Sequence, residues 1–258
     1  MHNLLQAWLA HPLTANVDID DPSAVELRRR IIQEKPFLKR IYLEWYEQLA
    51  AAVSSTPGSV LELGTGAGFL RDQLSGILTS DVFHHAGIDV VLDGSVLPIA
   101  DESLGAIVMV DVFHHIPSPR LFFAEAARCV RPGGSIVMIE PWVTPWSRLV
   151  YGKFHHEPFE TDAVQWEFPS TGPLSGANGA LPWIVFERDR KRFEQEFPGW
   201  RIHRIEIQMP FRYLVSGGLS MRNLVPGWTF TAWRVLERAL QPLMPSLGMF
   251  ALISLRRI

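Results

Sequence analysis

The sequence has few of the features that mark extracellular, membrane-spanning or nucleic-acid-binding proteins. A single cysteine, Cys129, is present among 258 residues, which excludes an internal disulfide and is typical of a reducing compartment. No apolar run approaches the roughly 18 to 20 residues that cross a bilayer. The formal charge of -3, from 24 basic and 27 acidic side chains, provides no overall electrostatic footprint for nucleic acid.

The N-terminus and the aromatic content bear on location. The first residues, MHNLLQAW, lack the basic segment and long apolar stretch of a secretory signal, so the sequence predicts a cytoplasmic protein. The chain nevertheless holds 9 Trp, 15 Phe and 19 Pro, more than a very polar surface suggests. This content favours either an apolar substrate pocket or a face in peripheral contact with a membrane.

The most informative segment is 59–70, with the sequence SVLELGTGAGFL. An apolar strand runs into a turn with glycines at 64, 66 and 68 and then into an expected helix over 69–74; such glycines let the backbone turn sharply and lie against a ligand. The spacing is G-x-G-x-G behind Glu62, not the G-x-G-x-x-G that seats a pyrophosphate. The motif therefore favours an adenosine cofactor without phosphates, and a tight strand-to-helix turn without a ligand is the alternative.

Alternating strands and helices organise the rest of the chain. Strands are predicted at 60–63, 77–81, 90–92, 105–110 and 136–139, with a helix over 120–130, a pattern typical of a mainly parallel sheet covered by helices. Two N-terminal helices, beginning near Asp21 and Pro36, form a predicted cover. Phe37, Ile41, Trp45 and Leu49 form an i, i+4 apolar stripe that is expected to pack on the core. Strands at 201–209 and 249–256 enclose a helical insertion. We expect a cover over 1–56, a cofactor-binding core over 57–145, and a substrate cap with closing strands over 146–258.

Three later segments agree in order and spacing with one family. They are 97–104 (LPIADESL), 114–117 (HHIP) and 128–134 (RCVRPGG). With the glycine loop they resemble the class I S-adenosylmethionine-dependent methyltransferases, in particular the type 11-like domain, across about 58–141. The resemblance implies an α/β, Rossmann-like, doubly wound and mostly parallel seven-stranded sheet with an antiparallel last strand.

The same resemblance implies which residues hold S-adenosylmethionine. Glu62 is expected to hold the cofactor's ammonium, and an acid at the tip of the second strand to accept both ribose hydroxyls. Asp81 is the choice for that acid, and Asp89 is its rival. Asp89 lies so close to the next motif that the helix between strands two and three is expected to be largely missing. The complete predicted cofactor set is Glu62, Gly64, Thr65, Gly66, Gly68, Asp81, Asp93 and Asp111, with Asp93 near the adenine; turn capping is the alternative role for Asp89 and Asp93.

The predicted catalytic candidates are histidines. His114 and His115 follow the fourth strand, at the sheet edge where open α/β folds bind ligands, and either is a candidate base if the acceptor loses a proton. His156, within the run HHEPFE at 155–160, is the third candidate. That spacing matches no strong zinc pattern such as H-E-x-x-H, and no metal site is predicted. A structural or substrate-positioning role is the alternative for these side chains.

These expectations combine into one predicted function. The protein transfers a methyl group from S-adenosylmethionine to a small-molecule or lipid-like acceptor. The insertion at 211–247 is either a lid whose Arg212 and Arg222 meet a charged headgroup, or ordinary helix packing. A nicotinamide-dependent oxidoreductase and a non-catalytic cofactor-binding protein are the alternatives. The sequence indicates neither the acceptor atom nor an oligomeric state.

Overall fold

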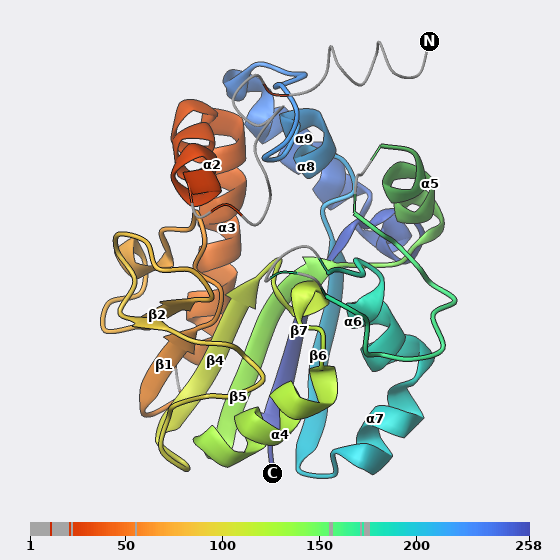
Figure 1. The fold of residues 1–258 in the computed structure, drawn as a ribbon. Helices are drawn as coiled ribbons and strands as arrows, with labels where there is room; N and C mark the ends of the chain where they lie inside the picture. The colour runs from red at the N-terminus through yellow and green to blue at the C-terminus, as the bar shows by residue number, and fades with distance from the viewer. Residues whose placement is uncertain are drawn as a thin grey trace.

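A seven-stranded sheet in the order β3-β2-β1-β4-β5-β7-β6 forms the centre of the molecule (Figure 1). The structure is a computed structural model that describes residues 11, 21, 23–54, 56–154, 157–170, 172 and 176–258. Neighbouring strands from β3 to β5 pair in parallel, whereas β7 pairs antiparallel with both β5 and β6. The predicted mostly parallel sheet with an antiparallel last strand is confirmed.

The first half of the sheet has almost no helical connections. Its strands are β1 (Ser59–Glu62), β2 (Leu78–Asp81) and β3 (Val90–Val91). The helix predicted over 69–74 is wrong, because the glycine loop leads only into a 3-10 turn, η1 (Leu70–Asp72). Arg71 in that turn is held by Asp89, and Gly76 at φ +76 bends the chain back before a helix develops. Residues 82–89 contain no helix, as predicted.

The middle of the chain follows the expected alternation. Strand β4 (Leu104–Val110) is buried along nearly its whole length, as suits a central parallel strand. It is followed by η2 (Phe113–His115), α4 (Pro119–Cys129) and β5 (Val130–Pro141). Residues 132–134 are part of β5, at the point where its register with β4 shifts.

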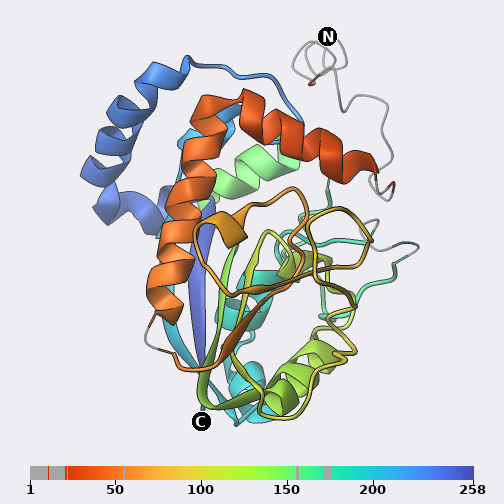
Figure 2. The same cartoon turned by 90° about the vertical axis from the view of Figure 1, so that its left-hand side faces the viewer.

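The N-terminal helices are α2 (Ser23–Glu34) and α3 (Pro36–Val53). Asp21 accepts a hydrogen bond from the Ser23 amide at 2.8 Å and so helps to start α2, as expected. The predicted apolar stripe of α3 is fully buried and consists of Phe37, Ile41, Trp45 and Leu49. Figure 2 shows α3 running along one face of the sheet while α2 turns across its upper end, where the parallel strands finish.

After β5 the chain builds the far side of the molecule and returns to the sheet. The helical elements before β6 are α5 (Pro145–Phe154), α6 (Leu181–Trp183), η3 (Ile184–Arg188) and α7 (Arg190–Glu196). Strands β6 (Trp200–Gln208) and β7 (Phe250–Arg257) enclose α8 (Arg212–Ser216), η4 (Gly227–Thr229), α9 (Phe230–Ala239), η5 (Gln241–Leu243) and α10 (Met244–Leu247). Among the described helices, none has both the length and the apolar character that a bilayer-spanning segment requires.

Candidate active site

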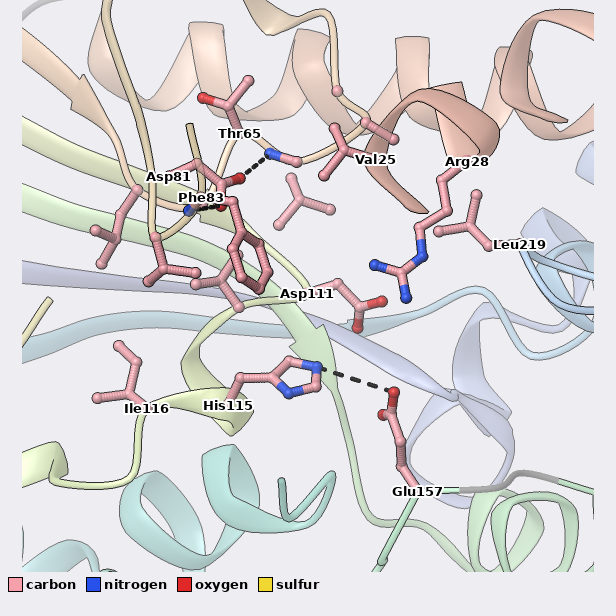
Figure 3. Close-up of a pocket in the computed structure, with 18 of the residues that line it drawn as sticks. Val25, Arg28, Thr65, Asp81, Phe83, Asp111, His115, Ile116, Glu157 and Leu219 are labelled. Atoms are coloured by element: carbon pink, nitrogen blue, oxygen red, sulfur yellow. Dashed lines mark hydrogen bonds and ion pairs between the residues drawn. The ribbon is translucent and has the colours of Figure 1, made fainter. Parts of the chain in front are cut away.

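A cavity of about 970 Å³ lies at the carboxyl ends of the parallel strands, beneath α2. This is the edge at which open α/β sheets bind ligands, and β1 and β4 flank the point where the strand order reverses. The volume is at the upper end of the usual range for small-molecule sites, roughly 300 to 1,000 Å³. Figure 3 shows Asp81 and Phe83 toward one end, Arg28 and Glu157 toward the other, and Asp111 between them.

The glycine loop after β1 forms one wall of this cavity. A side chain at Gly64, where φ is +68, would place its Cβ 2.6 Å from a methyl group of Val112. A Cβ at Gly68 would lie 2.7 Å from both the Thr65 carbonyl oxygen and the Tyr46 hydroxyl. Only glycine therefore allows the loop to pack this closely between β4 and α3.

Glu62 is a buried carboxyl at the start of the glycine loop. Its Oε2 accepts a hydrogen bond from the Thr65 hydroxyl at 2.9 Å. Burial raises the pKa of Glu62 to about 7, and the nearby charge of Asp81 acts in the same direction. A cation bound beside Glu62 would offset that burial and favour the ionised form, so the residue suits an ammonium group.

Asp81 stands at the tip of β2 and faces the loop. It accepts hydrogen bonds from the amides of Gly66 at 2.7 Å and Phe83 at 3.1 Å. His85 also approaches, with its Nε2 3.4 Å from Asp81 Oδ2. The Asp81 carboxylate already accepts the Gly66 amide, which a bound phosphate would need as a donor. After the glycine loop, the 3-10 turn η1 provides no α-helix N-terminus that could bind a pyrophosphate. The wall therefore fits a nucleoside better than a dinucleotide.

The two other acids predicted for this region differ in their surroundings. Asp93 lines the cavity just after β3, and its Oδ1 accepts a hydrogen bond from the Ser95 amide at 2.7 Å. Asp89 is not among the cavity-lining residues. It instead accepts the Thr79 amide at 2.9 Å and pairs with Arg71, which ties β2 to η1.

The tip of β4 places Asp111 at the centre of the cavity. Asp111 has φ +60, a conformation that costs energy for any residue with a side chain and is concentrated at functional sites. Its carboxyl lies under the helical cover, and burial raises its pKa to about 7. The charge of His114 opposes this rise, whereas those of Glu140 and Glu157 reinforce it.

His114 is fully enclosed and does not line the cavity. Its Nδ1 lies 2.7 Å from Glu140 Oε2 and its Nε2 lies 3.5 Å from Glu157 Oε2. Burial alone would lower the pKa of His114, but the hydrogen bonds to Glu140 and Glu157 raise it well above the usual value. The positively charged ring thus joins two carboxylates and fixes η2, which is a structural arrangement.

His115 points into the cavity from the same turn (Figure 3). Burial, reinforced by the charge of His114, lowers its pKa to about 4, so the ring is neutral at pH 7. Its Nδ1 lies 3.3 Å from the Gly176 carbonyl oxygen, and a ring that donates its proton there leaves Nε2 as an acceptor. That Nε2 lies 3.9 Å from Glu157. The third predicted histidine, His156, lies outside the described residues.

Two overlapping sets of these side chains come close enough to ligate a metal, namely His114, His115 and Glu157, and Asp111, His114 and Glu140. Both sets include His114, whose nitrogens already lie against carboxylates. A protonated imidazole has no lone pair for a metal. The arrangement therefore favours a network of ion pairs.

Two residues to which the sequence analysis assigned no role also shape this site. Glu140 is fully buried, and its Oε1 accepts the amides of Val112 at 2.8 Å and Phe113 at 2.7 Å. Arg28, on α2, extends its guanidinium toward Asp111 (Figure 3). An acid that ends a buried strand was a signal for Glu140, whereas Arg28 reaches the cavity only because α2 crosses the sheet edge.

Several aromatic or basic side chains near this edge of the sheet take packing roles. Trp142 is buried in the core, and Trp146 donates its indole N–H to the Pro210 carbonyl at 2.9 Å. Neither lines the cavity. Arg212 is enclosed between Glu44 and Glu237. Of the two alternatives given for Arg212, helix packing fits and contact with a headgroup does not, because both of these carboxylates already neutralise it.

Comparison with known proteins identifies part of the chain. Residues 61–138 match the family model described as a methyltransferase domain. A protein from Mycobacterium sp. (strain JLS), described as an uncharacterized methyltransferase, is 29% identical over 123 residues, which are 41% of this chain and 49% of the relative. The chain thus matches about half the length of that curated relative.

Solved structures show more distant similarity. Geranyl diphosphate C-methyltransferase from Streptomyces coelicolor A3(2), in complex with Mg2+, geranyl diphosphate and S-adenosyl-L-homocysteine, is 13% identical, with a TM-score of 0.47 and coverage of 97% of this chain and 89% of that one. An S-adenosylmethionine-dependent methyltransferase from Mesorhizobium loti is 16% identical, with a TM-score of 0.45 and coverage of 80% and 96%. The glycine loop, the β2 acid and the β4 tip lie inside the matched segment, so the part of the chain that holds them is similar to a methyltransferase domain.

Proposed function

We propose that this protein transfers a methyl group from S-adenosylmethionine to a small molecule with an apolar body and a proton-bearing nucleophile. The observation that carries this proposal is one cavity whose two ends differ in chemistry. The end formed by the glycine loop, Glu62 and Asp81 suits a nucleoside with a cationic side chain. The other end, under α2, mixes aromatic walls with a few titratable groups.

The roles of the residues at the cofactor end follow from the charges already described. Glu62 would hold the ammonium, Asp81 the ribose hydroxyls and Asp93 the adenine, while Gly64, Thr65, Gly66 and Gly68 bring backbone close to the ligand. S-adenosylmethionine supplies a methyl group activated by positively charged sulfur. Because the methyl is already activated, the protein's work is to align the acceptor, exclude water and remove a proton where the acceptor carries one.

The acceptor end is lined by both apolar and polar side chains. The aromatic rings there are Tyr42, Tyr151, Phe159, Tyr213 and Phe250. Few polar groups among apolar walls are typical of small-molecule sites. A lipid-like acceptor, predicted from the sequence, falls within the class that these walls suit.

Proton removal would fall to the β4 tip, where Asp111 is proposed as the base in place of the cofactor contact expected from the sequence. Asp111, with a pKa of about 7, is matched to the pH at which a general base works best. His115 is neutral and can accept a hydrogen bond from the molecule that receives the methyl group, which makes it a positioning residue beside Asp111. Arg28 can neutralise an anionic group of the bound molecules.

Two measurements test this function. Calorimetry should detect binding of S-adenosylhomocysteine and no binding of NAD; binding of NAD alone would assign the cavity to hydride transfer. Purified protein with methyl-labelled S-adenosylmethionine and a small-molecule extract should then release a labelled organic product. Asp111→Asn should lower label transfer by about 10²-fold or more while changing the S-adenosylhomocysteine affinity by less than threefold. Cofactor binding without transfer to any extract fraction would favour a non-catalytic protein.

A further inference from the structure

The lining of the cavity carries more negative than positive charge. Among the described residues that line it, Arg28 is the one permanent cation. The lining acids are Glu62, Asp81, Asp93, Asp111 and Glu157. Burial raises the pKa of Glu62 and of Asp111 to about 7, but the other three acids still outnumber the arginine when both are protonated. S-adenosylmethionine, whose sulfonium and ammonium outweigh its carboxylate, would offset only part of this excess.

The cation behind the cavity wall, His114, does not reverse this balance. His114 lies 2.7 Å from Glu140 and 3.5 Å from Glu157, so two carboxylates share its positive charge. The three groups together keep a net negative charge. A second molecule bound beside them is therefore favoured when it carries a positive charge and disfavoured when it carries a negative one.

Hydrogen-bond acceptors converge at the same place. Nε2 of His115 lies 3.9 Å from Oε1 of Glu157, too far for a direct hydrogen bond but near enough for one ligand nitrogen to reach both. This Nε2 is an acceptor, because only a protonated Nδ1 can bond to the Gly176 carbonyl oxygen. Asp111 supplies a third acceptor beside this pair (Figure 3), close enough to Glu157 for their charges to interact.

Three tyrosines lie near the Asp111 carboxyl. Tyr42, Tyr151 and Tyr213 line the cavity. For each of them, burial and then the charge of Asp111 raise the pKa of the hydroxyl, so all three stay uncharged at neutral pH. The face of an aromatic ring attracts a cation. Such rings beside a carboxylate therefore favour an ammonium over a neutral or anionic group.

We propose that the molecule methylated by this protein is an amine, and that Asp111, His115 and Glu157 hold its ammonium group. This inference rests on the proposed methyl transfer, whose acceptor it specifies. The three N–H donors of an ammonium match the three acceptors, whereas a hydroxyl offers a single donor. A carboxylate could pair with Arg28, but its charge would also lie beside Asp111 and Glu157, which makes it less well matched.

The chemistry of an amine agrees with the groups at this end of the cavity. An ammonium has no free electron pair, so one proton must leave before the nitrogen can react. Ionised Asp111 takes that proton. The electron pair of the nitrogen then forms the N–C bond while the C–S bond of the methyl donor breaks and its electron pair stays on sulfur. The products are a methylated ammonium, S-adenosylhomocysteine and protonated Asp111, which returns its proton to water.

Binding of small probes to the protein saturated with S-adenosylhomocysteine tests the proposal. The probes 2-phenylethylamine, 2-phenylethanol and 3-phenylpropanoate share a phenyl body and differ in charge. In calorimetry at pH 7.5 the amine should bind about tenfold or more tightly than the alcohol, because its hydrogen bonds to carboxylates are charge-assisted. Glu157→Gln should lower the amine affinity by about tenfold and leave the alcohol affinity unchanged, and His115→Phe should lower the amine affinity severalfold. Glu187→Gln, at an exposed glutamate that does not line the cavity, is the matched control and should change neither.

Other binding results would overturn the proposal. They are absence of amine binding, equal or tighter binding of the alcohol, or amine binding that is undiminished in both Glu157→Gln and His115→Phe. Preferential binding of 3-phenylpropanoate would assign the recognition to Arg28 and an anionic acceptor. The variants should match the parent in thermal unfolding and in S-adenosylhomocysteine affinity, which separates loss of the amine contacts from loss of the fold.

Label transfer separates this inference from the proposed function. The small-molecule extract is treated with acetic anhydride, which converts primary and secondary amines into amides, and then with hydroxylamine, which frees acetylated hydroxyls again. This treatment should remove most of the label transferred from methyl-labelled S-adenosylmethionine. Undiminished transfer would overturn the amine acceptor and leave methyl transfer standing. Amine binding without transfer to any extract fraction would overturn methyl transfer and leave an amine-binding site.

Discussion

Affinity for S-adenosylhomocysteine should rise with pH because Glu62 must lose its proton to pair with the ligand's ammonium. In the free protein, burial raises the pKa of Glu62 to about 7, from an ordinary value of 4.5. If the bound ammonium restores the ordinary value, proton linkage predicts that the affinity increases about twenty-fold between pH 5.5 and 7.5. The sign follows because the protonated carboxyl, which dominates at low pH, attracts the ammonium only weakly.

Calorimetric titration across that pH window measures the effect. An α-amino group has a pKa of roughly 7.7 to 8.0, so the ligand stays largely cationic throughout. Glu62→Gln should bind weakly, with less than a threefold change between the two pH values. Asp111→Asn should keep the full rise, which separates Glu62 from the other cavity carboxyl whose pKa is about 7. A flat profile in the parent, or an undiminished rise in Glu62→Gln, would refute the reasoning.

Three further substitutions test the loop, the buried network and the ribose site. Gly68→Ala places a Cβ 2.7 Å from a backbone carbonyl oxygen and a tyrosine hydroxyl and should weaken S-adenosylhomocysteine binding at least tenfold by calorimetry, whereas Gly152→Ala, with open space around its Cβ, should not. Glu140→Ala leaves two amides and a charged imidazole without their acceptor and should lower the free energy of unfolding in urea by about 3–5 kcal/mol; Glu140→Gln should lose less, and equal losses would contradict the charge pairing. Asp81→Ala should weaken calorimetric binding by about 10²-fold, from two charge-assisted hydrogen bonds at roughly 1.5 kcal/mol or more each, and an equal effect of Asp89→Ala would reassign the ribose role.

Local sequence signals were sufficient for much of the architecture. The run 59–70 predicted the β1 strand and its glycine turn, because buried strands and tight turns leave a strong pattern of apolar and glycine residues. Asp81 was placed at a strand tip for the same reason, and β2 ends at that residue. The stripe from Phe37 to Leu49 identified the buried side of α3.

Other features depend on contacts between distant parts of the chain. The absence of a helix at 69–74 follows from the links of Arg71 to Thr79 and Asp89, which no local pattern reveals. Arg28 enters the cavity only because α2 crosses the sheet edge. The buried pairing of His114 with Glu140 joins residues 26 positions apart. Such long-range contacts override local propensity, and spacing alone cannot place them.

The most direct test of the account is a crystal structure of the protein soaked with S-adenosylhomocysteine. We predict the ribose hydroxyls on Asp81, the ammonium beside Glu62, and the sulfur directed toward Asp111 and His115. Density for the ligand elsewhere on the protein, or in the reverse orientation with adenine beneath Arg28, would contradict the proposed roles of both ends of the cavity.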